Sequence, residues 1–266
     1  GKVTVPTPPA MPDEYAFMDN IAVGSYGNLA QQKTHARALV FFNETGTLLD
    51  TLTSTLPKLP TQQFADLSSF NIYRGGMASC TISRFEDGTA SVWVEGTHPL
   101  WKRDGNLRFK EIFNDTIYNV TSPGNVVPYA VFETGKWHLP AKAYYKEVNS
   151  KDKLMPTFVL EGNNSIFFQC VRGLYEKNPE TLNGVYNKRT GTTCLSTSRS
   201  GFTDDINGFR PFLPTTCGTQ GEYAQMVQAV TVLNWLDKHP EAKENPALAP
   251  LFNLGEEDNP VVILVR

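Results

Sequence analysis

Histidine, serine, cysteine and acidic residues could build a catalytic site here only if the fold brings distant positions together. The four histidines, His35, His98, His138 and His239, are scattered along the chain. The sequence contains no nucleophile elbow, Walker loop, dinucleotide fingerprint or zinc-protease helix. A Ser-His-Asp or Cys-His set would have to assemble in space, and a surface or capping role is the simpler interpretation of each histidine. We therefore predict a protein without catalytic residues or a cofactor.

One polar stretch offers clustered oxygen ligands of the kind that calcium binds, with Asp204, Asp205 and Asn207 in the run from Thr203 to Gly208. The stretch lacks the twelve-residue spacing of a calcium loop. We interpret it as a polar turn and predict no metal.

Four cysteines, Cys80, Cys170, Cys194 and Cys217, occur without CxxC spacing, which argues against a zinc knuckle or a redox motif. An even number of cysteines is compatible with two disulfides in a secreted protein. Four buried free thiols in a cytosolic protein are the alternative.

Four N-x-S/T sequons begin at Asn43, Asn114, Asn119 and Asn163. Their number is close to chance, but Asn43 and Asn163 stand in turn-like stretches where a glycan has room. Their placement favours a secreted glycoprotein, which would also form the disulfides.

Aromatic residues recur on the expected strands. Most must belong to a core, but a curved sheet that cannot fill itself would leave some of them lining a cavity for an apolar ligand. The candidate ligand-binding residues are Phe41, Tyr73, Trp93, Phe132, Tyr144, Phe158 and Phe167. An ordinary packed sandwich core explains the same residues equally well.

The elements that position these residues are short strands. The clearest pair is a hairpin of residues 77–85 and 89–95 around the loop Glu86-Asp-Gly88, with Val92 and Val94 on the face opposite Trp93. Evenly spaced strands with turn signals predict a mainly β fold, either a curved antiparallel sheet or a half-barrel or sandwich. Further strands are expected at 35–42, 47–55, 70–74, 107–113, 116–121, 126–133, 142–148, 155–161 and 165–170, with a loop over 96–105.

The tail changes character. Residues 173–214 are rich in loop signals, and Thr219-Gln-Gly-Glu222 matches a capping box before a helical apolar spacing, which predicts a C-terminal helix at about 220–238. The apolar run Val261–Val265 predicts a buried last strand or a partner-binding edge. We expect a β domain over 1–195 and an extension over 196–266 that packs on the same domain.

Charge and hydropathy exclude two classes of partner. The formal net charge is −3, and charged residues form no basic stripe, so a nucleic-acid partner is not expected. No apolar run approaches the ~18 residues that cross a bilayer, so we predict no membrane span.

The order of the expected strands resembles the animal ependymin-related and LolA-like secreted proteins. The resemblance covers about residues 10–195 and includes the start at Pro12-Asp-Glu-Tyr15, the strand with Phe41 and Phe42, Tyr73, Cys80-Thr-Ile-Ser83, Ser165-Ile-Phe-Phe-Gln169 and Cys194. The tail after Cys194 and the number of cysteines depart from the pattern. The resemblance implies a curved antiparallel sheet that cups an apolar pocket, and no catalytic residues. It also implies pairing of Cys80 with Cys194, which leaves Cys170 with Cys217.

From the sequence we therefore expect a secreted glycoprotein that carries an apolar ligand such as a lipid, sterol or carotenoid. Two alternatives remain. One is an assembly glycoprotein of an extracellular coat that forms homo-oligomers through the tail, and the other is a glycan-acting hydrolase.

Overall fold

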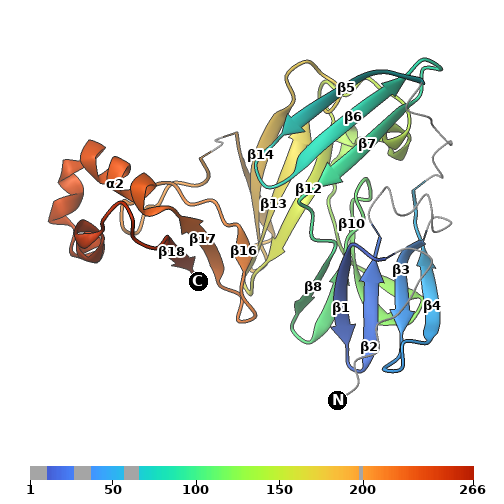
Figure 1. Cartoon of the computed structure of the whole chain (residues 1–266), viewed down its shortest axis with the longest axis horizontal. Helices are drawn as coiled ribbons and strands as arrows, with labels where there is room; N and C mark the ends of the chain where they lie inside the picture. The colour runs from blue at the N-terminus through green and yellow to red at the C-terminus, as the bar shows by residue number, and fades with distance from the viewer. Residues whose placement is uncertain (1–10, 27–36, 57–65, 198–199) are drawn as a thin grey trace. The chain divides into compact units, whose positions relative to one another are not determined.

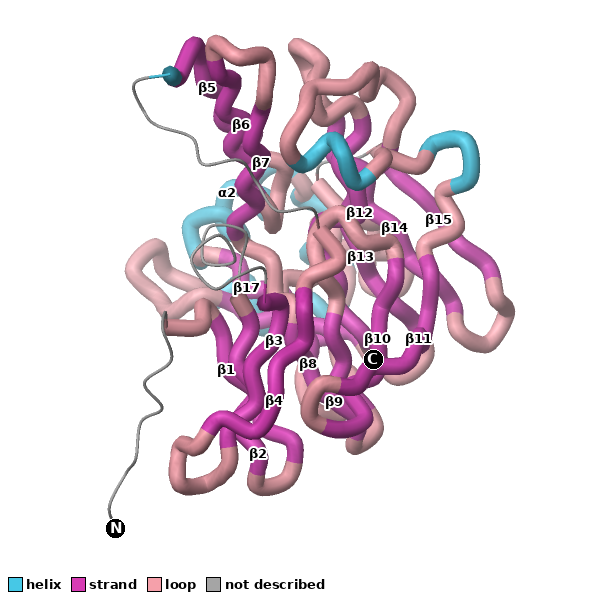
Figure 2. Tube along the Cα trace, turned by 90° about the vertical axis from the view of Figure 1, so that its right-hand side faces the viewer, coloured by secondary structure: helices cyan, strands magenta, loops and turns pink. Residues whose placement is uncertain are grey.

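The computed structural model describes residues 11–26, 37–56, 66–197 and 200–266 (Figure 1). Strands predominate along the trace (Figure 2), which confirms the mainly β class with antiparallel sheets and a C-terminal helix. The strands are β1 (Glu14–Met18), β2 (Ile21–Ser25), β3 (Arg37–Phe42), β4 (Leu48–Thr53), β5 (Leu67–Arg74), β6 (Ser79–Phe85), β7 (Ala90–Glu95), β8 (Leu100–Arg103), β9 (Asn106–Phe109), β10 (Thr116–Ser122), β11 (Asn125–Val131), β12 (Leu154–Glu161), β13 (Ser165–Arg172), β14 (Glu180–Asn187), β15 (Thr192–Ser196), β16 (Thr216–Cys217), β17 (Tyr223–Val227) and β18 (Val261–Val265). The helices are α2 (Ala229–Lys238) and the 3-10 helices η2 (Gly135–Trp137), η3 (Ala141–Tyr144), η4 (Pro240–Glu244) and η5 (Pro246–Asn253).

The chain divides into two compact units. Unit 1 comprises Gly1–Val159 with Phe168–Thr181, and unit 2 comprises Leu160–Phe167 with Leu182–Arg266. The boundary therefore runs through β12, β13 and β14, which belong to a sheet with the order β12-β13-β14-β15. The division expected at residue 195 stays a prediction, and in the structure the turn after β12 packs with the tail.

Unit 1 contains three sheets with the orders β1-β2-β3-β4, β5-β6-β7 and β11-β10-β9-β8, each made of strands that follow one another in the sequence. Its two larger apolar clusters lie in different parts of the unit, and a smaller one surrounds Val40. One of the larger clusters joins β1–β3 to β8–β10 around Phe41 and Leu107, and the other joins β6 and β7 to η3 around Cys80 and Tyr144.

The hairpin of β6 and β7 forms as expected. Gly88 takes a φ of 79°, and the N–H of Phe85 donates to the carbonyl of Thr89 at 3.1 Å. Val92 and Val94 are buried, whereas Trp93 faces the other way and keeps 39% of its surface exposed. Alternation of side chains therefore correctly predicted the two faces of this hairpin.

Two expectations for unit 1 are wrong. Residues 96–105 are not all loop, because Asp104 and Gly105, both with positive φ, make a two-residue turn that joins β8 to β9. Residues 142–148 do not form a strand, because Pro140 precedes the 3-10 helix η3, which contains Tyr144.

The tail shows two further differences. Residues 173–214 include β14 and β15, so the expected long loop is shorter.

The expected helix at 220–238 begins only at Ala229, because Tyr223–Val227 is strand β17 and pairs along its whole length with β18. Gly221, with a φ of 86°, lies in the turn before β17, so Thr219–Glu222 is not a capping box. Pairing with an apolar neighbour strand outweighs the helical spacing of Tyr223, Met226 and Val227.

Unit 2 contains most of β14, all of β15, the sheet β16-β17-β18 and the helices α2, η4 and η5. One face of β17 and β18 packs with these helices in an apolar cluster around Val232 and Leu236. The other face is exposed.

Candidate functional site

An open groove of about 470 Å³ lies within unit 2. This volume is inside the range of roughly 300–1,000 Å³ that is typical of small-molecule sites. Five aromatic residues line it: Phe167, Phe202, Phe209, Phe212 and Tyr223. Aliphatic residues add Val185, Ile206, Ile263, Leu264 and Val265, so the lining is mostly apolar.

Tyr223 fixes β17 to the turn between β12 and β13. Its hydroxyl accepts from the N–H of Gly162 at 3.1 Å and lies 2.8 Å from the carbonyl oxygen of Ser165. Asn163 donates from Nδ2 to the carbonyl of Gln220 at 2.6 Å, and Lys188 forms an ion pair with the buried Glu161 at 2.7 Å. These contacts join the turn between β12 and β13 to β17, to the turn before β17 and to Lys188, which follows β14.

The loop over 202–214 supplies the aromatic wall. Phe202 and Phe212 exchange two backbone hydrogen bonds of 2.8 Å, and the ring of Phe202 meets that of Phe167 edge-on at 5.9 Å. Gly201 has a φ of 102°, and a Cβ there would collide with the carbonyl of Phe212. Glycine is therefore required where the two backbone segments approach each other.

The polar run at 203–208 lies in this groove and is a turn, as the sequence predicted. The Asp204 carboxylate accepts from the backbone N–H groups of Ile206, Asn207 and Phe209 at 3.0, 3.0 and 3.2 Å. Burial alone would raise the pKa of Asp204, but these three N–H donors outweigh it and lower the pKa. The side chain thus organises the loop. Among the described residues, no group of three or more His, Cys, Asp or Glu side chains could hold a metal ion.

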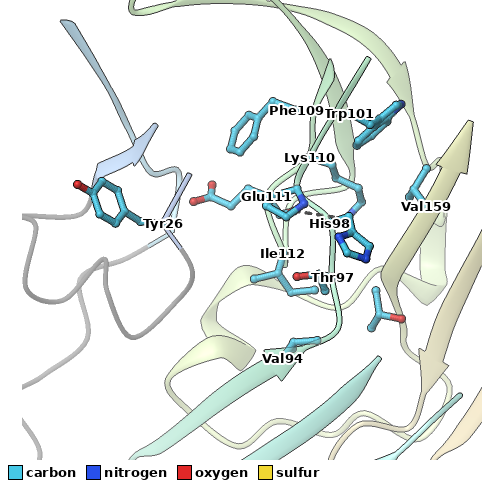
Figure 3. A pocket seen from close by; sticks show the side chains of 12 residues that line it. Tyr26, Val94, Thr97, His98, Trp101, Phe109, Lys110, Glu111, Ile112 and Val159 are labelled. Carbon is cyan, nitrogen blue, oxygen red and sulfur yellow. Dashed lines mark hydrogen bonds between the residues drawn. The ribbon is translucent and has the colours of Figure 1, made fainter. Parts of the chain in front are cut away.

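A second, much smaller pocket of about 50 Å³ lies in unit 1 (Figure 3). Trp101, Phe109, His98, Lys110 and Glu111 are among the residues that line it. The volume suits a water-sized group. It is too small for an apolar ligand.

The charged residues of this small pocket are engaged with the protein. Lys110 donates from Nζ to the carbonyls of Pro156 at 3.1 Å and Glu111 at 3.3 Å, and burial lowers its pKa to about 8. The Glu111 carboxylate accepts from the N–H of Thr55 at 3.0 Å and from the hydroxyls of Ser54 and Thr55. In Figure 3 this carboxylate is directed away from the His98 ring, on the side of Tyr26. The geometry therefore does not bring the Glu111 carboxylate and the His98 ring together in this pocket.

The seven candidate aromatics do not gather in one place. Phe167 lines the groove, whereas Phe41, Tyr144 and Phe158 are buried in unit 1 and Tyr73 packs against the core there. Phe132 packs edge-on against Phe168, and Trp93 is part of neither pocket. The sequence missed the aromatics of the 202–214 loop because the strand pattern that selected candidates is absent there.

The four cysteines are free thiols in the structure. The pairing of Cys80 with Cys194 and of Cys170 with Cys217 would join residues of different units and stays a prediction. Cys80 and Cys170 are buried, and burial raises both thiol pKa values to about 12. Cys194 is exposed on β15, and Cys217 donates from Sγ to the carbonyl of Glu161 at 3.3 Å.

The four sequon asparagines differ in what their side chains do. Asn114 uses Nδ2, the atom that a glycan would occupy, to donate to Thr55 and Tyr118, and Asn163 uses it to donate to Gln220. Asn119 accepts from Arg108 through Oδ1, and Asn43 accepts from Thr45 and Thr47 through Oδ1. Asn43 therefore organises its turn without engaging Nδ2 in these bonds.

The histidines serve local contacts. His98 lies 3.4 Å from Glu14, and this hydrogen bond raises its pKa although burial opposes the change. His138 contacts Asp115 at 2.8 Å, and His239 lies 2.8 Å from the carbonyl of Trp235. His35 lies outside the described residues.

The described helices include none with the length and apolarity that a membrane crossing requires.

Sequence reasoning also missed the buried charges of unit 1. Arg108 is buried, donates to Asn119 and lies 3.8 Å from the ring centroid of Tyr129. Arg103, Lys110 and Glu111 are buried as well. The local sequence gives one sign of these buried charges: Arg108 and Lys110 alternate with Leu107 and Phe109 in a predicted strand.

Two solved structures show weak likenesses to this chain. A Bacteroides fragilis NCTC 9343 protein inferred to be exported matches with 13% identity and a TM-score of 0.42, over 99% of this chain and 93% of that one. A streptogramin B lyase structure matches with 12% identity and a TM-score of 0.23, over 84% of this chain and 78% of that one. At these scores neither likeness supports an argument about fold or function.

No curated protein matches the chain. The sequence profile of a domain of unknown function, DUF4934, matches residues 1–266. This chain therefore belongs to the DUF4934 family.

Proposed function

We propose that this chain is a secreted binding protein that holds an apolar small molecule in the groove of unit 2. The observation that carries the proposal is an open groove of about 470 Å³ with a mostly aromatic and aliphatic lining. Each methylene group that leaves water contributes about 0.8 kcal/mol. Part of this is lost to ordering the ligand, so we expect a micromolar dissociation constant.

Secretion and glycosylation rest on the sequons. The turn at Asn43, where a glycan has room, supports both proposals. The free thiols give no support to secretion. The resemblance to ependymin-related and LolA-like proteins stays a prediction, and the binding role it implies now rests on a different set of residues.

Titration with the uncharged fluorescent probe N-phenyl-1-naphthylamine tests the proposal. Ile206 lines the groove and is 81% exposed, so Ile206→Asp introduces a charge there without disturbing the core. Val230→Asp makes the same change at an exposed site on α2 that is not among the residues lining the groove. We expect saturable binding that Ile206→Asp weakens at least about tenfold and Val230→Asp leaves unchanged. Absence of saturable binding, or equal effects of the two variants, would overturn the proposal.

A second candidate, self-assembly through the tail, is favoured by the exposed face of β17 and β18. Met226, Val262 and Leu264 are 63, 59 and 57% exposed on that face, and β18 is at the edge of the strand order β16-β17-β18. Antiparallel pairing with β18 of a second copy about Ile263 would bring Arg266 near the acidic residues 256–258 of that copy. Charge complementarity thus favours a second copy as the occupant of the edge.

Light scattering during size-exclusion chromatography tests this candidate. We expect a dimer that Val262→Lys converts to a monomer, because a lysine on an edge strand opposes pairing. A wild-type protein that stays monomeric up to high micromolar concentration would contradict self-assembly and leave the groove proposal intact.

A further inference from the structure

The groove combines an apolar lining with cationic side chains, of which Arg210 lies in the loop that supplies the aromatic wall. Arg210 lines the groove and, among the described residues, its guanidinium makes no hydrogen bond or ion pair. A guanidinium carries five N–H donors in a fixed planar fork that matches a carboxylate. An arginine among the residues that line an apolar groove is therefore suited to receive an anionic group.

The acidic residues of the groove do not occupy Arg210. Both carboxylate oxygens of Asp204 accept backbone N–H groups of their own loop, from Ile206 and Asn207 on Oδ1 and from Phe209 on Oδ2. Asp205 is exposed and forms no ion pair within the described residues. Arg266 supplies a second cation among the lining residues.

We propose that the ligand of this groove is an amphipathic anion, with an alkyl chain along the aromatic wall and a carboxylate that the Arg210 guanidinium binds. The inference rests on the proposed function and specifies its ligand class. A neutral lipid of the same length would fill the apolar part equally well but leave Arg210 without a partner. The head group therefore determines how much more tightly the groove binds the anion than the neutral lipid.

Dodecanoate and dodecan-1-ol form a matched pair that differs only in the head group. Their dissociation constants are measured by displacement of N-phenyl-1-naphthylamine from wild type, Arg210→Gln and Arg189→Gln. Arg189 is exposed in unit 2 and is not among the residues lining the groove, so Arg189→Gln makes the same charge change elsewhere. Thermal unfolding of each variant verifies that it is folded.

We expect wild type to bind dodecanoate about tenfold more tightly than dodecan-1-ol, since a hydrogen bond to a charged group contributes more than a neutral one. Arg210→Gln should remove this difference by weakening dodecanoate about tenfold and dodecan-1-ol less than about twofold, and Arg189→Gln should change neither. Raising the salt concentration should weaken only dodecanoate.

Two outcomes overturn the inference in different ways. If both ligands bind equally and Arg210→Gln has no selective effect, the head-group assignment fails while the groove remains an apolar site. If neither ligand displaces the probe and the probe itself does not bind, the proposed function fails as well.

Discussion

The hydroxyl of Tyr223 on β17 lies 2.8 Å from the carbonyl oxygen of Ser165 at the start of β13 and also accepts from the N–H of Gly162 at 3.1 Å. Both Tyr223 and Ser165 line the groove, so this contact sets the separation of two of its walls. Burial raises the pKa of Tyr223, which keeps the phenol protonated and able to donate at neutral pH.

Tyr223→Phe should therefore lower the free energy of unfolding by about 1–2 kcal/mol, because it removes hydrogen bonds without creating a large cavity. Urea unfolding measures the change. Tyr186→Phe on β14 is the control, since the Tyr186 hydroxyl makes no hydrogen bond to the described residues. Equal effects of the two substitutions would show that the Tyr223 hydroxyl does not stabilise the groove.

Lys110 should make stability depend on pH in the alkaline range. Burial lowers its folded-state pKa to about 8, whereas Asp115 and Cys170 oppose the change. An unfolded lysine titrates near 10.4. Between these values the unfolded state binds more protons, so the free energy of unfolding from this group rises with pH, by a total of order 3 kcal/mol.

Lys110→Met removes this titration, so between about pH 8 and pH 10 the free energy of unfolding of the variant should rise less, or fall more, with pH than that of wild type, in which the buried thiols act in the opposite direction. Urea unfolding at several pH values across this range provides the measurement. Lys102→Met, at an exposed lysine on β8, should keep the wild-type slope. The pKa assignment is refuted if Lys110→Met and wild type show parallel curves.

The cysteines should be distinguishable by reactivity. Cys194 is exposed and should react with a thiol reagent in the native protein, whereas Cys80 and Cys170 should react only after unfolding, because burial excludes the reagent and raises their pKa. Titration under non-reducing conditions should find four thiols in denaturant. Fewer than four would restore the disulfide expectation.

Val92→Ala and Trp93→Ala should separate folding from binding. Val92 is completely buried, so its truncation should cost about 2 kcal/mol of stability. Trp93→Ala should leave binding of the probe unchanged, in contrast to the sequence-based expectation that Trp93 contacts the ligand. A loss of binding in folded Trp93→Ala would show that the ligand binds in unit 1 and not in the groove.

The parts of the fold that were predictable are those with local causes. Gly88 and the alternation from Cys80 to Val94 specify a hairpin and its faces without help from distant residues. Asp104-Gly105 is an equally strong turn signal. It was not recognised because His98, Pro99 and Trp101 made the segment 96–105 resemble a loop. The strand Tyr223–Val227 was not predictable from its own spacing, because its state depends on Val261–Val265, more than thirty residues away.

The groove was predictable only in fragments. Asp204 was recognised as a turn former, and Phe167 was one of the candidate aromatics. Their proximity depends on contacts such as Tyr223 with Ser165 and Asn163 with Gln220, between segments nearly sixty residues apart. Sequence periodicity contains no information about such pairings.

The most direct test of the central claim is to locate the ligand. A dodecanoate analogue with a photoreactive diazirine at the end of its chain is activated on the protein, and the labelled residues are mapped by mass spectrometry. We expect labels within 202–214 and 263–266 that excess dodecanoate suppresses. Labels around His98 and Trp101 in unit 1, or labels that dodecanoate does not suppress, would contradict it.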